Sequence, residues 1–298
     1  MKHIKFLAIG MLCSALLFSD ENAVTEEMHL SKRMENCTPQ PCPIIGKSGK
    51  AEQEIGQTTS DQGYYYGMQE DDFRIQVGGN YTYAWISPSG SPTVKGSLGG
   101  ADALFEYRPL NSVYAGVSFA YHQGTPKAGG TERSLLDFDT QGRIGFTASS
   151  RLYGKSRIAL FTGFGGRYMG EKATAGDASV KFDYVQFYVP VGFLFENRLS
   201  YRFAWGVNAQ WRPQIFPTVD IIPLDGARWI LKKKINNFLV DVPLSFFVSD
   251  HFAIIVDPFY ELWHDGHTTA ETQTGLLLGL PGNRYTFTGV NVNLAWSF

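Results

Sequence analysis

Two short stretches of the sequence carry carboxylates at a spacing that could support acid–base chemistry. Asp137 and Asp139 stand one residue apart in LLDFDT, and Asp265 and His267 stand one residue apart in HDGH. A carboxylate beside a histidine can orient the imidazole and stabilise its charged form, and such a pair can activate a water molecule. These four residues are the candidates for a hydrolytic site. The alternative interpretation is that the inward Asp residues simply pair with Arg143, since two Asp residues one apart are common.

The other residues that could do chemistry form no nucleophilic or metal-binding set. His122 has no partner that the sequence identifies, so an acyl hydrolase is not indicated. Cys37 and Cys42 occur in CTPQPC, and two cysteines this close in an exported chain predict one local disulfide, with bonds to another chain as the alternative. A zinc site would need more ligands than His29 supplies. We therefore expect no metal and no cofactor.

The composition restricts the class of protein. The chain has 298 residues, 44% of them apolar, and a net charge of -2, so nothing indicates nucleic-acid binding. It contains 32 Gly, 22 Phe and 15 Tyr but only 18% charged residues, below the roughly 25% usual in soluble domains. This balance is typical of repeated strands joined by tight turns. No apolar run of about 18 residues follows the N-terminal region, so no membrane-spanning helix is predicted.

The first residues have the features of an export signal. Lys2 and Lys5 precede an apolar stretch, and Ser19 is a small residue at which cleavage could fall. A short membrane anchor is the alternative, although the stretch is too short to span a bilayer. We expect residues 1–19 to be a signal peptide that is removed together with Cys13.

Two further parts of the chain differ in pattern. Residues 20–71 are polar and have neither helical nor strand period, which predicts a flexible arm. From Asp72 to Phe298 apolar and polar side chains alternate, as they do in strands. The clearest example is SYRFAWGVNAQWRP. About ten strands are predicted, with eight or twelve as alternatives, near 72–86, 94–108, 112–123, 132–147, 157–169, 179–195, 201–212, 227–248, 251–264 and 283–298.

The connections between these strands alternate in length. Short links are expected at 109–111, 149–156, 196–198 and 249–250, and longer loops near 87–93, 124–131, 170–178, 213–226 and 265–282. Short turns at one end and long loops at the other are typical of transmembrane barrels.

The two faces of the predicted strands differ in a way that indicates which one meets lipid. The bases on the polar face are all Arg, whose planar fork suits carboxylate pairing in a confined space. Tyr and Trp lie near the strand ends of the apolar face, as in the aromatic girdles of membrane barrels. A soluble sandwich with aromatics between two sheets is the alternative. The residues expected to line a lumen are Arg74, Asp102, Glu106, Arg108, Asp137, Asp139, Arg143, Arg167, Arg202, Arg212, Asp257 and Glu261.

The last strand, RYTFTGVNVNLAWSF, indicates how the sheet ends. In lipid every backbone polar group must be paired within the protein, so membrane-spanning strands must close into a barrel. We therefore expect the last strand to pair with the first and to turn Leu294, Trp296 and Phe298 toward lipid.

With its signal sequence, alternating strands and terminal Phe298, the chain resembles the bacterial outer-membrane β-barrel proteins over residues 72–298. In that class the C-terminal strand with its final aromatic residue is recognised by the assembly machinery. The resemblance implies an all-β, closed antiparallel barrel in the outer membrane, in contact with its lipid, its lipopolysaccharide and the barrel-assembly machinery. Pro190, Pro243 and Pro258 depart from this pattern, because each removes a donor from a predicted strand; bulges or strand limits are expected there.

Strand number predicts what the lumen can do. Barrels of about 8 strands are filled by side chains, whereas open aqueous channels appear at about 16–18. We therefore expect a narrow or occluded lumen with an internal Arg–carboxylate network, and a structural or surface-binding role. A small-solute porin is the first alternative. The large side chains expected to point inward are Tyr114, Phe161, Tyr184, Tyr188, Phe259 and Trp263.

An enzyme is the second alternative. The chain is similar in length and strand number to the omptin proteases, barrels with acidic pairs and an Asp–His pair at the outer rim. That likeness would give Asp137, Asp139, Asp265 and His267 catalytic roles. The surrounding motif residues of the family are missing here, so we expect no enzymatic activity.

A basic run, Lys232, Lys233 and Lys234, is expected near the outer rim. Such a run is either a solvated strand end or a surface that attracts lipopolysaccharide phosphates or acidic host surfaces.

Overall fold

The computed structural model describes residues 72–128, 130–149, 156–175, 178–222, 228–271 and 279–298. The predicted signal peptide, the arm at 20–71 and both of its cysteines lie outside these residues. Within the described part of the chain, no helix is long and apolar enough to cross a membrane. All regular structure in this part is antiparallel β-sheet.

The sheet contains sixteen strand segments. They are β1 (Phe73–Pro88), β2 (Val94–Tyr107), β3 (Val113–Gly124), β4 (Lys127–Ala128), β5 (Thr131–Ser149), β6 (Ser156–Ala175), β7 (Ala178–Tyr188), β8 (Val191–Ser200), β9 (Phe203–Trp211), β10 (Thr218–Ile222), β11 (Arg228–Leu231), β12 (Phe238–Asp241), β13 (Leu244–Phe247), β14 (Phe252–His264), β15 (Thr268–Glu271) and β16 (Asn283–Ser297).

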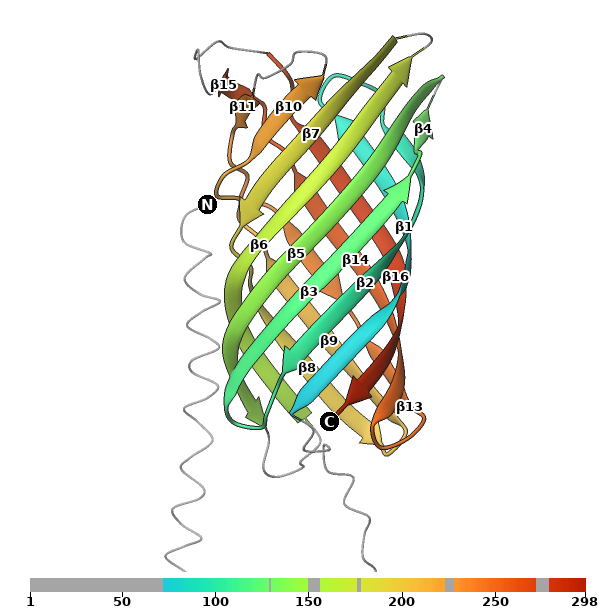
Figure 1. Ribbon diagram of the computed structural model, residues 1–298, viewed down its shortest axis with the longest axis vertical. Coiled ribbons are helices and arrows are strands. Elements are labelled where there is room, and N and C mark those ends of the chain that lie inside the picture. Colours follow the sequence, from blue (N-terminus) through green and yellow to red (C-terminus); the bar gives the residue numbers. More distant parts are fainter. Residues whose placement is uncertain (1–71, 129, 150–155, 176–177, 223–227, 272–278) are drawn as a thin grey trace, which may run out of the picture. The chain divides into compact units, whose positions relative to one another are not determined.

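These segments form a closed barrel of ten strands, as the sequence predicts. β1, β2, β3, β5, β6 and β16 each form one barrel strand. The pairs β7–β8, β9–β10 and β14–β15 and the triplet β11–β12–β13 form the other four, because their members continue one another along the same neighbours. The short strand β4 is additional. Figure 1 shows the strands tilted against the long axis, with β4, β10, β11 and β15 at the upper end and the C-terminus at the lower end.

The last strand closes the barrel against the first. β16 pairs with β1 along its whole length, with Val290 opposite Tyr81. At the lower end, Phe73 N donates to Phe298 O at 3.1 Å and Phe298 N donates to Phe73 O at 3.0 Å. The pairing leaves no free edge between these two strands, which is the requirement for a sheet in lipid.

Two of the three prolines mark strand limits. β7 ends at Tyr188 and β8 begins after Pro190, while β12 and β13 are separated by Val242 and Pro243. Because proline cannot donate to the ladder, these interruptions confirm the expectation. Pro258 differs, since it lies inside the continuous strand β14 opposite Val290.

Several expected connections are wrong. The loops expected at 213–226 and 265–282 contain β10 and β15, and the loop expected at 124–131 contains β4. Residues 196–198 continue β8, and the turn is formed by Tyr201 and Arg202. Residues 170–175 belong to β6, which pairs with β7 up to Ala178. In β6 the outward side chains past residue 170, Lys172 and Thr174, are polar and look like loop residues. Residues 196–198 were misassigned because Glu196, Asn197 and Arg198 form a short polar run, although the exposed Leu199 continues the apolar outer face.

Four neighbouring barrel strands are interrupted at the same level, just above Trp211. Here ladder pairing is replaced by single backbone hydrogen bonds that join one strand to the next. Ile215 N donates to Phe187 O at 2.8 Å, Gln214 N to Lys234 O at 3.0 Å, and Lys232 N to His267 O at 2.9 Å. The wall therefore stays connected although its register is irregular.

The outer surface is apolar and the interior contains two different fillings. Ile75, Val77, Ile144 and Phe164 are among many large apolar side chains that are exposed on the outward face. The upper interior holds an apolar core, whose largest members are Trp229, Trp263, Tyr184, Tyr188, Tyr285 and Phe287. Below this core the interior contains charged side chains and a smaller apolar cluster of Tyr114, Ala159, Phe161 and Leu194.

Candidate functional site: the charged network inside the barrel

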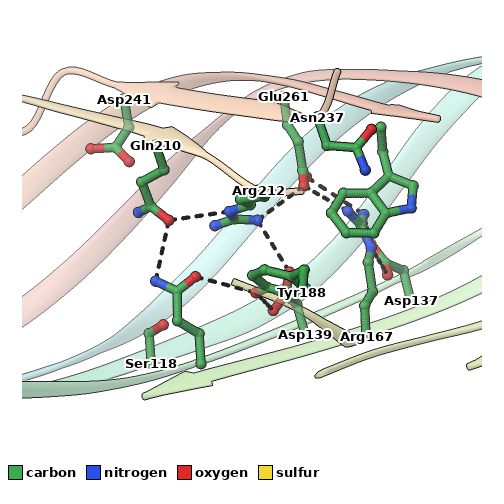
Figure 2. A network of polar contacts seen from close by, with 12 residues as sticks. Ser118, Asp137, Asp139, Arg167, Tyr188, Gln210, Arg212, Asn237, Asp241 and Glu261 are labelled. Atoms are coloured by element: carbon green, nitrogen blue, oxygen red, sulfur yellow. Dashed lines mark hydrogen bonds and ion pairs between the residues drawn. The ribbon is translucent and has the colours of Figure 1, made fainter. Parts of the chain in front are cut away.

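Five charged side chains meet across the middle of the lumen, and we call them the arginine network: Asp137, Asp139, Arg167, Arg212 and Glu261. They come from different strands. Asp137 and Asp139 lie on β5, Arg167 on β6 and Glu261 on β14, while Arg212 follows β9. Each occupies an inward position because successive side chains of a strand alternate between the two faces. Figure 2 shows Glu261 between the two guanidinium groups.

Arg167 is the best-connected member of the network. Its Nε and Nη2 donate to Asp137 Oδ1 and Oδ2 at 2.8 and 2.6 Å, which is a bidentate pair. Its Nη1 donates to Glu261 Oε1 at 2.6 Å. The guanidinium carbon also lies 4.7 Å from the ring centroid of Trp263 in the apolar core. Arg167 thus joins three strands and connects the charged layer to the core above it.

Arg212 forms the second half of the network. Its Nη1 donates to Glu261 Oε1 at 3.1 Å and to Asp139 Oδ2 at 3.2 Å. The Tyr188 hydroxyl donates to the other Asp139 oxygen. Glu261 Oε1 therefore receives hydrogen bonds from both arginines, and every carboxylate of the network contacts a guanidinium.

Burial makes these pairs strong constraints on the structure. Arg167 is 2% exposed, Asp137 1% and Glu261 6%. Removing one partner of a buried pair leaves a charge without compensation, which costs about 3–5 kcal/mol. The network consequently ties β5, β6 and β14 together across the lumen.

A second charged layer lies near the lower end. Arg74 Nη2 donates to Glu106 Oε2 at 2.6 Å, and the Tyr114 hydroxyl donates to Glu106 Oε1 at 2.7 Å. Arg108 Nη1 donates to Glu196 Oε2 at 2.7 Å. This layer narrows the lumen at the end of the barrel opposite the apolar core.

Most residues expected to line a lumen are placed inside the barrel, and one is not. The charged residues of both layers, with Arg143, Asp102 and Asp257, face the interior. Arg202 is exposed in the turn after β8, with its guanidinium carbon 4.9 Å from the Tyr201 ring centroid. That expectation is wrong because the turn lies at 201–202, so Arg202 precedes the strand in which inward alternation begins.

The structure does not assemble the proposed hydrolytic site. Asp137 and Asp139 are bound by the two arginines. Asp265 is buried and accepts from Gln186 and from Trp263 Nε1, the latter at 3.1 Å. His267 is exposed, and no ion pair joins it to Asp265 in the described part of the chain. The imidazole that does approach a carboxylate is His122, whose Nδ1 lies 3.5 Å from Asp137 Oδ2.

Three buried carboxylates were missed by the sequence reasoning. Glu171 accepts a hydrogen bond from the Tyr285 hydroxyl at 3.0 Å, Glu196 pairs with Arg108, and Asp241 accepts from Asn208 at 2.7 Å. Glu171 lies four residues after Arg167, so continued alternation would have placed it inward. The sequence analysis assigned Glu171 and Glu196 to connections between strands. Asp241 lies where Pro243 interrupts the alternation of apolar and polar residues.

The two predicted surface features are outward-facing. Lys232 and Lys233 are exposed after β11, and Lys233 Nζ lies 5.3 Å from the ring centroid of exposed Phe216. At the C-terminus, Leu294, Trp296 and Phe298 are each about half exposed on the outer face. Phe298 also stacks on Phe73, with ring centroids 5.5 Å apart.

Known proteins resemble this chain in fold only. No protein-family model matches it, and no curated protein matches its sequence. Among solved structures, the outer membrane protease OmpT from Escherichia coli aligns with a TM-score of 0.50 and 9% identity, over 77% of this chain and 97% of that one. The translocator domain of autotransporter NalP from Neisseria meningitidis gives a TM-score of 0.40 and 11% identity, covering 76% and 90% of the two chains. Ail of Yersinia pestis gives 0.34 and 11%, covering 76% and 99%. The chain has the fold of a bacterial outer-membrane β-barrel.

Proposed function

We propose that the protein is an integral barrel of a bacterial outer membrane whose lumen is occluded, and that its role is structural or surface-binding. The observation that carries this proposal is the arginine network, which joins β5, β6 and β14 across the lumen beneath the apolar core. A pore needs a continuous water-filled path, whereas here two different fillings lie in series.

Conductance in planar bilayers tests the occluded lumen. The purified full-length protein should show small or no conductance, because about ten strands enclose little free volume and large side chains occupy it. A general porin reconstituted under the same conditions serves as the positive control. Large and stable conductance steps from this protein would contradict the proposal and favour the porin alternative.

The proposed location follows from the apolar outer face and from the export signal expected at residues 1–19. The mature protein should fractionate with outer membrane. Replacing Phe298 by Asp should impair assembly without affecting export, since a charge would replace the exposed aromatic end of β16. Phe298→Trp keeps that aromatic character and should assemble normally. Soluble wild-type protein in the periplasm would contradict the proposal.

A second candidate function is binding of lipopolysaccharide phosphate at the upper outer surface. Lys232 and Lys233 are exposed beside Phe216 and Ile235, which are 63% and 47% exposed. Cations next to exposed apolar groups suit the boundary between phosphate groups and acyl chains. The double variant Lys232→Gln, Lys233→Gln should retain less lipopolysaccharide on purification. Lys127→Gln, which removes an exposed lysine of β4 at the same end of the barrel, is the control.

A further inference from the structure

A polar cavity of about 140 Å³ lies below the arginine network, and Arg212 is the one network residue in its lining. We call it the acidic cavity. A smaller cavity of about 90 Å³ adjoins it and is lined by all five residues of the arginine network. The two cavities share Asp102, Ser118, Ala120, Arg212, Leu239, Asp241 and Asn291. One water needs roughly 10–15 Å³ of such volume, so the acidic cavity has room for a group of several heavy atoms.

Three carboxylates face this cavity, and each is held by an asparagine. Asn293 Nδ2 donates to Asp102 Oδ2 at 2.7 Å, Asn208 Nδ2 to Asp241 Oδ2 at 2.7 Å, and Asn291 Nδ2 to Asp257 Oδ2 at 3.4 Å. All six residues line the cavity. In each of the three pairs the uncharged amide of an asparagine holds one carboxylate oxygen in place, and no positive charge is added.

Three of the remaining acceptors of these residues lack donors, whereas Asn208 Oδ1 accepts from Gln210 Nε2 at 3.3 Å. Asp102 Oδ1, Asp257 Oδ1 and Asn293 Oδ1 are buried without a hydrogen-bond partner, and Asn293 as a whole is only 4% exposed. An unpaired buried acceptor costs about 1–3 kcal/mol. Several such acceptors around one cavity therefore favour a ligand that carries N–H or O–H donors.

The charge around the cavity favours a cationic ligand. In the described part of the chain, Asp102, Asp241 and Asp257 take part in no ion pair. Of the arginines that line the cavity, Arg74 and Arg212 already contact other carboxylates. Arg143, which donates to Ser118 Oγ at 3.3 Å, remains as one positive charge against three carboxylates.

We propose that the acidic cavity binds a small organic cation, a guanidinium or primary ammonium group, through Asp102, Asp241 and Asp257. Such a group offers several N–H donors and a positive charge, and it matches carboxylate acceptors well. A metal ion fits less well, since no group of three His, Cys, Asp or Glu side chains in the described residues is arranged to hold one.

The ligand would enter from the lower end of the barrel. The apolar core and the arginine network separate the cavity from the upper end. On the lower side its lining includes Arg74 and Gln76, which belong to the polar layer around Glu106.

Binding is tested on the full-length protein in detergent with methylguanidinium chloride, using calorimetry and ligand-observed NMR. Methylurea has nearly the same shape without the charge and is the matched control probe. We expect saturable binding of methylguanidinium and none of methylurea. Asp241→Asn and Asp257→Asn should each weaken binding about tenfold or more, because each removes a charged hydrogen-bond acceptor.

Two further variants separate the cavity from the protein's charge in general. Asp250→Asn removes a carboxylate that is exposed in a turn at the lower end, and it should bind like wild type. Ala120→Leu should abolish binding by filling the cavity without changing its charge. Equal binding of both probes, no binding by folded wild type, or unchanged binding by the Asp241, Asp257 and Ala120 variants would overturn the proposal.

Discussion

The arginine network and the acidic cavity lie next to each other in one lumen, yet they compensate their carboxylates differently. In the network Asp137, Asp139 and Glu261 each contact a guanidinium. In the cavity the carboxylates contact neutral amides, such as Asn208 beside Asp241. The comparison teaches that burial alone does not define a role for an acidic residue. Carboxylates paired with arginine have their charge compensated within the protein, whereas Asp102 and Asp257, held by asparagine, each keep one oxygen without a partner.

Removing the central arginine should have the largest effect. Arg167→Met leaves Asp137 and Glu261 buried without their main partner, so the free energy of unfolding should fall by about 3–5 kcal/mol. Urea unfolding in lipid vesicles, followed by tryptophan fluorescence, measures this change. Arg202→Met, in an exposed turn, is the control and should change stability by less than about 0.5 kcal/mol. Equal effects of the two variants would show that the network does not hold the strands together.

A glycine next to the cavity-lining Asn293 should have the next largest effect. A Cβ at Gly78 would lie 1.9 Å from Asn293 Oδ1 and 2.2 Å from Val292 O. Gly78→Ala should therefore displace Asn293 from Asp102 and cost about 1–3 kcal/mol in unfolding free energy.

The adjacent glycine provides the control for this test. A Cβ at Gly79 would meet nothing closer than Gly100 O at 3.7 Å, so Gly79→Ala should be almost neutral. If Gly78→Ala and Gly79→Ala unfold at the same urea concentration, the Asn293–Asp102 contact does not require the absence of a Cβ at position 78.

The smallest effect should also have the opposite sign. Asp241→Asn removes one of three like charges around the cavity, so it should leave stability unchanged or raise it by up to about 1 kcal/mol. The same substitution at Asp137 removes the acceptor of a bidentate pair and should destabilise the barrel. The unfolding curve of Asp137→Asn should therefore move to lower urea concentration, while that of Asp241→Asn stays in place or moves to higher concentration. A loss of stability at Asp241 as large as that at Asp137 would break the distinction between the two regions.

The fold was predictable because alternation is a local signal. The period of the side chains predicts that the strand ending at Phe298 is regular and that Arg167 points inward. The missing N–H donor of proline predicts the interruptions at Pro190 and Pro243. The positions of turns were less predictable, as Arg202 shows. Beyond the apolar band the outward residues are polar, and nothing in the sequence then distinguishes a projecting strand from a loop.

The sequence predicts that charged residues face the lumen, but it does not predict which of them form ion pairs. Alternation indicates that Asp139 and Arg212 face inward, but which side chains meet depends on how the strands are staggered around the barrel. The contact of Arg212 with Asp139 joins two strands that are not neighbours in this way. His122 and Asp137, by contrast, stand directly opposite each other on the paired strands β3 and β5. The acidic cavity was also not visible, since it depends on neutral partners such as Asn208 and Asn293, which resemble ordinary polar strand residues.

The pairing of β16 with β1 has a consequence for how the chain folds. The two strands stand at opposite ends of the barrel sequence, so their ladder is the contact with the greatest sequence separation. Loop-closure entropy makes such contacts slow to form relative to hairpins between consecutive strands. Until they form, β1 and β16 are two open edges, each able to accept a foreign strand. A factor that occupied the β16 edge during this interval would control both the rate of barrel completion and the risk of aggregation.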